Sequence, residues 1–90
     1  MEFSDPPVWI TEVRHLGGFR VWLRFNDGLE GDIDVWPELR GEIFEPLRDP
    51  ALFAQVRLHT DYETIVWPNG ADLAPEFLYE QVKRAASDAA

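Results

Sequence analysis

The residues best suited to chemistry gather in one short segment, where His59, Asp61 and Glu63 take alternate positions. Alternate side chains of an extended segment share a side, and an imidazole nitrogen with two carboxylates is a ligand set for a divalent metal. However, Asp61 and Glu63 fall where we place a turn, and a metal site also needs fixed geometry and supporting groups around its ligands. We therefore predict a solvated hairpin tip, with no metal site and no cofactor.

Carboxylates also alternate at Glu30, Asp32 and Asp34. Three like charges on one strand face could bind a cation, or they could face Arg20 and Arg24 of the preceding strand. We predict the second arrangement, in which opposite charges pair across the hairpin. The sequence marks no acid as buried with a raised pKa, which a general acid would need.

Nucleophiles and phosphate-binding loops have no recognisable motif. Ser4 and Ser87 lie in the expected tails, and no motif surrounds the threonines. The glycine pair at 17–18 precedes a strand pattern and lacks the following Lys-Ser/Thr, so it does not fit a phosphate loop. His15, just before that pair, is interpreted as a strand-end residue with no obvious partner. We predict no catalytic residues and expect a protein that is not an enzyme.

Net charge is the global property with the most functional content. Seventeen acidic residues against eight basic ones give −9, and Lys83 is the only lysine. Proteins neutralise phosphate backbones with Lys and Arg, so direct nucleic-acid binding is not expected. A basic protein partner would be attracted over long range. The alternative is that the acidity only keeps a small protein soluble.

The composition also bears on location. The chain has no cysteine, its first residues have no basic and apolar leader, and no apolar run approaches the ~18 residues of a membrane span. We expect a cytoplasmic protein that does not associate with membranes.

Tryptophan supplies the candidate contact surface. Trp22 alternates with Arg20 and Arg24 on the polar side of its strand pattern, and Trp36 lies one register step beyond Asp34. Exposed tryptophan bordered by arginine is typical of interface anchors. The candidate interface is therefore Arg20, Trp22, Arg24 and Trp36. The alternative is that a helix, the N-terminal tail or a cation–π contact with Arg24 covers Trp22 within the monomer.

Alternation of apolar residues predicts the strands that carry these side chains. Residues 8–16, 19–25 and 29–35 are predicted to form three antiparallel strands after a flexible tail at residues 1–7.

The alternation of apolar side chains in the strands at 19–25 and 29–35 then selects the length of the turn between them. A three-residue turn at 26–28 sets Phe25 opposite Leu29, so that the apolar side chains of both strands lie on one face of the sheet. It also predicts a positive φ at Gly28, and it places Arg24 opposite Glu30 and Arg20 opposite Asp34.

The second half of the chain is predicted to contain shorter helices and strands. Pro46 limits a short helical stretch at 41–47, and Asp49 is a good N-cap for a helix of at most two turns. Residues 56–60 and 64–67 are predicted to form a hairpin, with Trp67 in the core beside the final helix.

The final helix is predicted from Pro75 to Ala86, with Leu78, Val82 and Ala85 or Ala86 on one apolar stripe. Residues 87–90 are expected to fray. The fold class is α+β, in a single domain at residues 8–86. It is an antiparallel three-stranded meander plus a second β-hairpin, one or two short helices, and a C-terminal helix packed on one sheet face.

Two longer motifs resemble a known family. They are Phe-Glu-Pro-Leu-Arg-Asp-Pro-Ala-Leu-Phe-Ala-Gln-Val at 44–56 and Val-Trp-Pro-Asn-Gly-Ala-Asp-Leu-Ala-Pro-Glu-Phe-Leu-Tyr at 66–79. With the Asp-Gly hairpin, they are similar to the bacterial family called domain of unknown function 2442, over about residues 8 to 82. Ala74 departs from this pattern, because relatives usually have a capping Ser or Asp there.

The resemblance implies little about activity, since the family has no established biochemical function. Some members resemble the front half of proteins that carry a helix-turn-helix domain, and we expect this chain to lack that DNA-binding domain. Others are encoded beside a second small family in a toxin–antitoxin-like arrangement.

Two functions from different classes follow. The first is a non-enzymatic interaction module, an antitoxin-like or regulatory partner of a basic protein, with a homodimer left open. The second is a small-molecule or regulatory ligand-binding domain, whose pocket would lie near Trp67, Asn69, Asp72 and Glu76. Asn69 and Asp72 also suit turn and capping roles.

Overall fold

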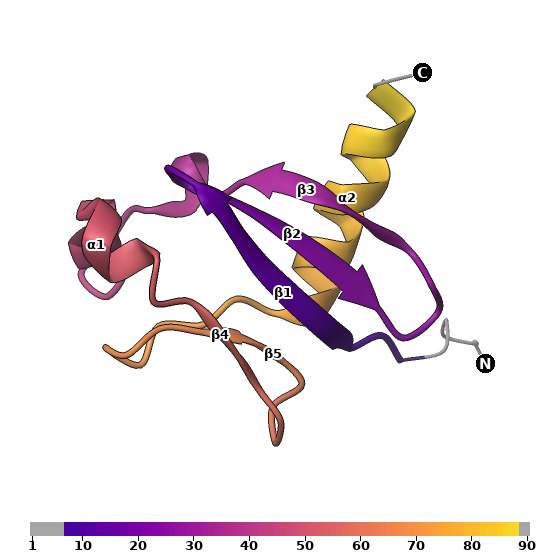
Figure 1. The fold of residues 1–90 in the computed structure, drawn as a ribbon, viewed down its shortest axis with the longest axis horizontal. Helices are drawn as coiled ribbons and strands as arrows, with labels where there is room; N and C mark the ends of the chain where they lie inside the picture. Colours follow the sequence, from indigo (N-terminus) through magenta and orange to yellow (C-terminus); the bar gives the residue numbers. More distant parts are fainter. Residues whose placement is uncertain (1–6, 89–90) are drawn as a thin grey trace.

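The computed structural model describes residues 7–88, and the expectations for residues 1–6 and 89–90 lie outside this range. β1 (Ile10–Gly17), β2 (Arg20–Phe25) and β3 (Glu30–Asp34) form an antiparallel sheet in that spatial order (Figure 1). The α+β fold class is confirmed.

The turn between β2 and β3 has the predicted three-residue length. Phe25 N–H donates to the Leu29 carbonyl oxygen at 2.8 Å, and Gly28 has φ +94°. Asp27 Oδ1 accepts a hydrogen bond from Leu29 N–H at 3.0 Å, which closes the turn locally. The parity of the apolar residues was therefore enough to set this register.

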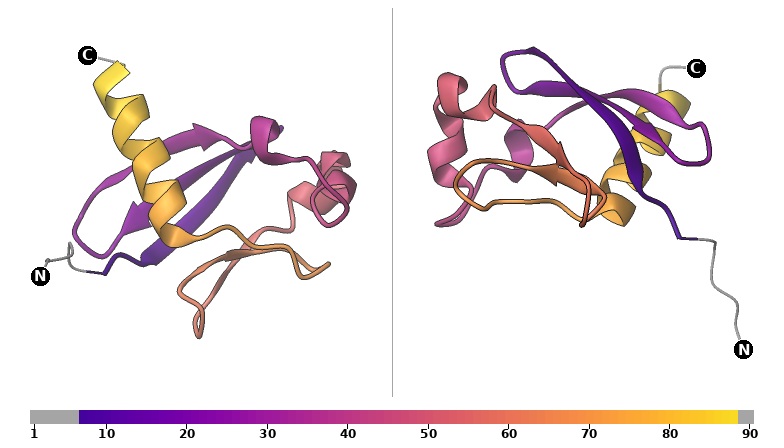
Figure 2. Two further views of the ribbon diagram at one scale, coloured as in Figure 1. Left: turned by 180° about the vertical axis from the view of Figure 1, so that it is seen from behind. Right: turned by 60° about the horizontal axis from the view of Figure 1, so that its bottom comes forward.

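α2 (Pro75–Asp88) crosses one face of the sheet, as the rear view in Figure 2 shows. Leu78 and Val82 are buried, and Gly31 of β3 leaves room for the helix, since a Cβ there would lie 3.0 Å from Val82 Cγ1. The helix ends two residues beyond the predicted Ala86, so residues 87–88 are helical rather than frayed. The predicted apolar stripe is also too long, because residues 85–86 are exposed.

The chain between β3 and α2 forms a second small unit. It contains η1 (Trp36–Glu38), η2 (Glu45–Arg48), α1 (Pro50–Phe53) and a two-stranded sheet of β4 (Arg57–His59) and β5 (Thr64–Val66). Asp49 is the N-cap of α1, because its Oδ1 accepts a hydrogen bond from Ala51 N–H at 3.0 Å. Figure 1 shows the β4–β5 hairpin beside β1, where Ile10 N–H donates to the Glu63 carbonyl at 2.9 Å.

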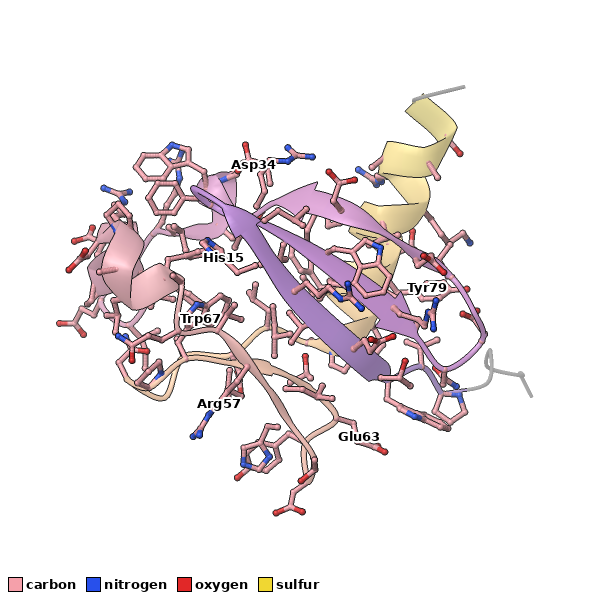
Figure 3. All side chains as sticks on the ribbon, viewed as in Figure 1. His15, Asp34, Arg57, Glu63, Trp67 and Tyr79 are labelled. Carbon is pink, nitrogen blue, oxygen red and sulfur yellow. The ribbon has the colours of Figure 1, made fainter. Side chains whose placement is uncertain are left out.

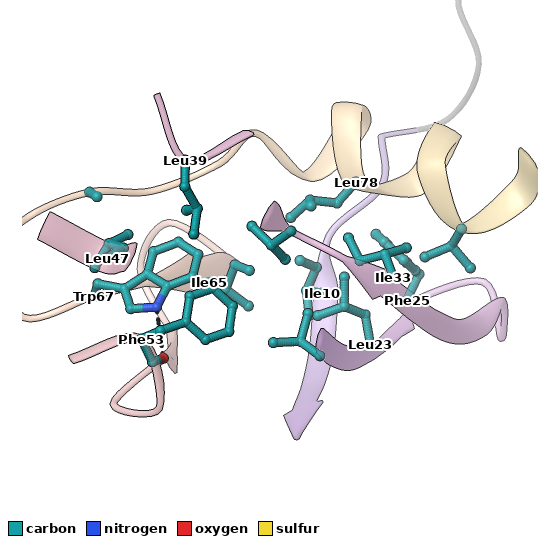
Figure 4. Close-up of a cluster of buried hydrophobic side chains, with 14 residues drawn as sticks. Ile10, Leu23, Phe25, Ile33, Leu39, Leu47, Phe53, Ile65, Trp67 and Leu78 are labelled. Atoms are coloured by element: carbon teal, nitrogen blue, oxygen red, sulfur yellow. Dashed lines mark hydrogen bonds between the residues drawn. The ribbon is translucent and has the colours of Figure 1, made fainter. Parts of the chain in front are cut away.

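One apolar core joins the two units (Figure 4). Trp67 is 2% exposed, and its Nε1–H donates to the Phe53 carbonyl oxygen at 3.0 Å. The core position of Trp67 was predicted, but its ring contact and this bond go to α1 rather than to the final helix. The side chains buried in this core are Ile10, Val21, Leu23, Phe25, Ile33, Val35, Leu39, Leu47, Phe53, Ile65, Trp67, Ala71, Leu78 and Val82.

Within residues 7–88, no helix is both long enough and apolar enough to cross a bilayer. α2 has 14 residues, fewer than the ~20 that a span requires.

Candidate interaction surface

The sheet face opposite α2 carries the polar side chains of all three strands, and we call it the open face. Its members share one side of the strands, as the cross-strand pairing shows. They are Glu12, Arg14, Arg20, Trp22, Arg24, Glu30, Asp32 and Asp34. This face is turned toward the viewer in Figure 3, where Asp34 is labelled at the end of β3.

Trp22 lies at the centre of the open face between two arginines. The Arg14 guanidinium carbon is 5.3 Å from the ring centroid, and that of Arg24 is 5.6 Å away. The ring is partly buried, so the structure favours the cation–π alternative, with Arg14 as a second cation that the sequence reasoning missed. Pairing of Arg14 with Trp22 across β1 and β2 explains this contact. A register for β1 would have been needed to find it.

Ion pairs surround Trp22. Glu12 lies 3.6 Å from Arg14 and 3.3 Å from Arg24, and Arg24 also reaches Glu30 at 3.1 Å, as predicted. These side chains are between 41% and 68% exposed, so each pair contributes about 0–1 kcal/mol to stability.

Arg20 corrects one expectation. The register does place it opposite Asp34, yet its Nη2 pairs diagonally with Asp32 Oδ2 at 2.6 Å. Asp34 Oδ1 instead accepts a hydrogen bond from Trp36 N–H at 3.0 Å, where the chain leaves the strand. The hydrogen bond from Arg20 lowers the pKa of Asp32 below its ordinary value.

Trp36 does not continue the alternation of β3. Val35 already has helical φ and ψ, so the strand parity stops before Trp36. The Trp36 ring is 4.9 Å from Phe19 and 5.4 Å from the Arg48 guanidinium carbon, and the residue is 47% exposed. The structure therefore groups Arg20, Trp22 and Arg24 on the open face and gives Trp36 different neighbours.

The Trp-Pro-Asn-Gly turn is held by its own hydrogen bonds. Asn69 Oδ1 accepts a bond from Ala71 N–H at 3.1 Å, and its Nδ2 donates to the Ile43 carbonyl at 2.9 Å. Trp67 N–H donates to the Ala71 carbonyl at 3.0 Å, and Asp72 forms a bridge with Val66. Asn69 and Asp72 therefore have structural roles in this turn.

Two hollows among the described residues lie away from this turn. One of about 270 Å³ is formed by residues 57–61, and one of about 500 Å³ lies between α2 and the β2–β3 turn. Neither is lined by Trp67, Asn69 or Asp72, so the pocket at that turn stays a prediction. Of its residues, Glu76 alone reaches the larger hollow. The lining residues there are Pro7, Val8, Asn26, Asp27, Glu76, Tyr79, Glu80 and Lys83.

Tyr79 joins α2 to the turn beside this hollow (Figure 3). Its hydroxyl donates to Asp27 Oδ2, and its ring meets Phe25 edge-on at 5.1 Å. The pKa of Asp27 is lowered, first by the bond from Tyr79 and next by that from Leu29 N–H. Glu76, Tyr79, Glu80 and Lys83 recur at helical spacing, a signal that could have marked this helix face from the sequence.

Both histidines have local partners. His15 Nε2 lies 3.0 Å from the Gly18 carbonyl oxygen and its ring is 5.8 Å from Phe53, two partners that were not obvious from the sequence. His59 Nδ1 accepts hydrogen bonds from Asp61 and Tyr62 N–H at 3.2 Å, and its ring stacks on Tyr62 at 4.2 Å. No group of three His, Asp or Glu side chains in the described part of the chain is arranged to hold a metal.

The fold and this surface define a small α+β domain with one helix-covered sheet face and one open, charged face. The chain belongs to the family described as "Protein of unknown function (DUF2442)", whose model matches residues 10–84. That match begins with β1 and ends within α2. No curated protein and no solved structure matches the chain.

Proposed function

We propose that this protein is a non-enzymatic interaction module, an antitoxin-like or regulatory partner of a basic protein. The observation that carries the proposal is the distribution of charge over the fold. The open face holds three arginines and four carboxylates and is therefore close to neutral, at −1. Among residues 7–87, ten acidic and five basic side chains lie outside the open face and have a net charge of −5.

This separation suits a protein that attracts a basic partner from a distance and contacts it through a neutral patch. Unlike charges at long range raise the association rate, whereas aromatic and arginine side chains at the contact supply affinity. The ion pairs of the open face are solvent-exposed, so a partner can rearrange them at little cost.

The two carboxylates with shifted pKa values are not suited to acid–base catalysis. Asp27 and Asp32 have lowered pKa values, because each accepts a hydrogen bond from a neighbouring side chain. A general acid or base needs a pKa near the working pH, and these shifts lead away from it.

The test is binding to the product of the neighbouring gene, which the proposal requires to be a basic protein, measured as association rate against salt concentration. A matched variant removes four exposed carboxylates outside the open face: E42Q, E45Q, D61N and E80Q. We expect slower association for this variant and a rate that falls with salt for the wild type. Absence of binding at low salt, or equal rates for both proteins, would overturn the proposal.

A further inference from the structure

β3 is an edge strand with unpaired backbone groups. Within residues 7–88 no strand pairs with its outer side. The bonds from Phe25 N–H to the Leu29 carbonyl and from Val35 N–H to the Phe19 carbonyl fix which pairs are hydrogen-bonded. Because bonded and non-bonded pairs alternate in an antiparallel ladder, the backbone groups of residues 30, 32 and 34 point away from β2. Those three residues can pair with another strand.

The end of α2 lies beside this edge. Val82 meets Gly31 of β3, and Ala85 and Ala86 follow about one turn later and are exposed. One turn of helix advances about 5.4 Å, close to the roughly 4.8 Å between neighbouring strands. Figures 1 and 2 show the C-terminal end of α2 projecting beyond β3. The two alanines therefore lie where they could support a strand added next to β3.

Charge indicates which kind of strand fits. The side chains of Glu30, Asp32 and Asp34 alternate along β3 on the open face, and all three residues are exposed. In the described contacts Arg24 binds one oxygen of Glu30, Arg20 binds one oxygen of Asp32, and Trp36 N–H binds one oxygen of Asp34. A carboxylate can accept several donors, so further cations can be accommodated.

A second copy of this chain fits the edge poorly. An antiparallel β3–β3 pair centred on Asp32 would place like charges directly opposite each other, which destabilises a sheet. A strand with lysine or arginine at alternate positions would instead place opposite charges across the new pair.

We infer that the free edge of β3 receives an extended, basic segment of the partner protein as a fourth strand. Its Lys or Arg side chains face Glu30, Asp32 and Asp34, and its intervening small apolar side chains rest on Ala85 and Ala86. The inference rests on the proposed function and names the site and the peptide chemistry of that binding. Strand addition of this kind draws affinity from main-chain hydrogen bonds and specificity from alternate side chains.

The experiment uses a short synthetic peptide in which lysine alternates with valine, and a control peptide of equal composition with its lysines grouped together. Amide hydrogen exchange of the wild-type protein is followed by NMR. The alternating peptide is expected to slow exchange about tenfold at the N–H groups of residues 30, 32 and 34. Unchanged exchange at these groups in the saturated complex would overturn strand addition.

Two variants of Asp32 distinguish what its backbone N–H contributes to peptide binding from what its carboxylate contributes. D32A and D32P both remove the carboxylate, but only D32P removes the outward N–H, and proline is tolerated at such an edge position. D32P is expected to bind the alternating peptide about tenfold more weakly than D32A, once thermal unfolding shows both variants to be folded. Equal affinities would overturn strand addition, as would preference for the control peptide.

The two proposals fail in different ways. If D32P binds the neighbour-encoded basic protein as well as D32A does, the β3 edge is not the site, while the basic partner stands. In that case the acidic residues of β3 protect the edge against pairing, a common role for charges on edge strands. If neither the basic protein nor the alternating peptide binds at low salt, both proposals fall.

Discussion

The two faces of the three-stranded sheet are built from the same strands, and successive residues of each strand lie on opposite faces. On the face covered by α2, Val21, Leu23 and Phe25 of β2 are at most 1% exposed. Their neighbours Arg20 and Arg24 lie on the open face and form ion pairs with β1 and β3. Alternation therefore assigns packing to one side of each strand and polar contacts to the other.

Stability depends on one face of this sheet much more than on the other. A buried leucine loses its transfer free energy and leaves a cavity when truncated, whereas an exposed ion pair is replaced by hydration. Substitutions on the open face can therefore test the proposed binding without unfolding the domain, whereas substitutions on the covered face destabilise it.

The largest expected effect contrasts two adjacent residues of β2. Leu23→Ala should lower the free energy of unfolding by about 2–5 kcal/mol, because Leu23 is fully buried under α2. Arg24→Ala should lower it by about 1 kcal/mol, since that side chain is 46% exposed. Urea unfolding measures both. Equal losses would show that the open face is as important to stability as the core.

Much of this contrast could be predicted from local sequence. The β2–β3 register followed from parity around residues 26–28, because a shift by one residue would have exposed Phe25. The cap of α1 also followed from Asp49 and Pro50, since capping is decided within one turn of helix.

What could not be predicted depends on residues distant in the chain. The Arg14–Trp22 contact needs the register of β1, and the choice of Asp32 by Arg20 depends on side-chain geometry rather than on pairing. The exposure of Ala85 depends on how far α2 extends past β3, which the period of the helix cannot reveal. The hollow beside Tyr79 is formed by the tail end, a turn and a helix, which the sequence does not show to be adjacent.

The second prediction concerns the contact between the covered face and α2. Gly31→Val should destabilise the protein by about 1–3 kcal/mol, because the new side chain would collide with Val82. Val82→Ala alone creates a cavity, but it should relieve part of the loss in the double variant. Thermal unfolding of the wild type, the two single variants and the double variant gives the coupling free energy between the two sites. Additive losses would mean that α2 moves aside rather than clashing.

The third prediction concerns Tyr79, which ties the helix to the turn. Tyr79→Phe removes the donor to Asp27 and should raise the pKa of that carboxyl toward its ordinary value, as NMR titration can show. The folded pKa of Asp27 is lowered, so its contribution to stability is present above the unfolded pKa and is lost as pH falls through the folded pKa.

Wild type and Tyr79→Phe should therefore differ in unfolding free energy near neutral pH by more than they do in acid. Asp27→Asn is the matched control, because it removes the titrating group and should abolish the pH dependence of that difference. A difference between the wild type and Tyr79→Phe that is independent of pH would indicate that the hydroxyl acts through packing instead.

Arg14, beside Trp22 on the open face, should contribute the least to stability of the residues compared. Arg14→Gln removes one cation beside Trp22 and should lower the free energy of unfolding by about 0.5–1 kcal/mol. Arg57→Gln is the matched control, since Arg57 is an exposed strand arginine that no described side chain pairs with, and it should have no measurable effect. A double-mutant cycle with Trp22→Leu measures the interaction free energy of Arg14 with Trp22 separately from the ion pair of Arg14 with Glu12. A coupling free energy of zero would mean that a partner can displace Arg14 from the Trp22 ring at no cost. A favourable coupling would mean that a partner must replace the interaction that Arg14 makes with the ring.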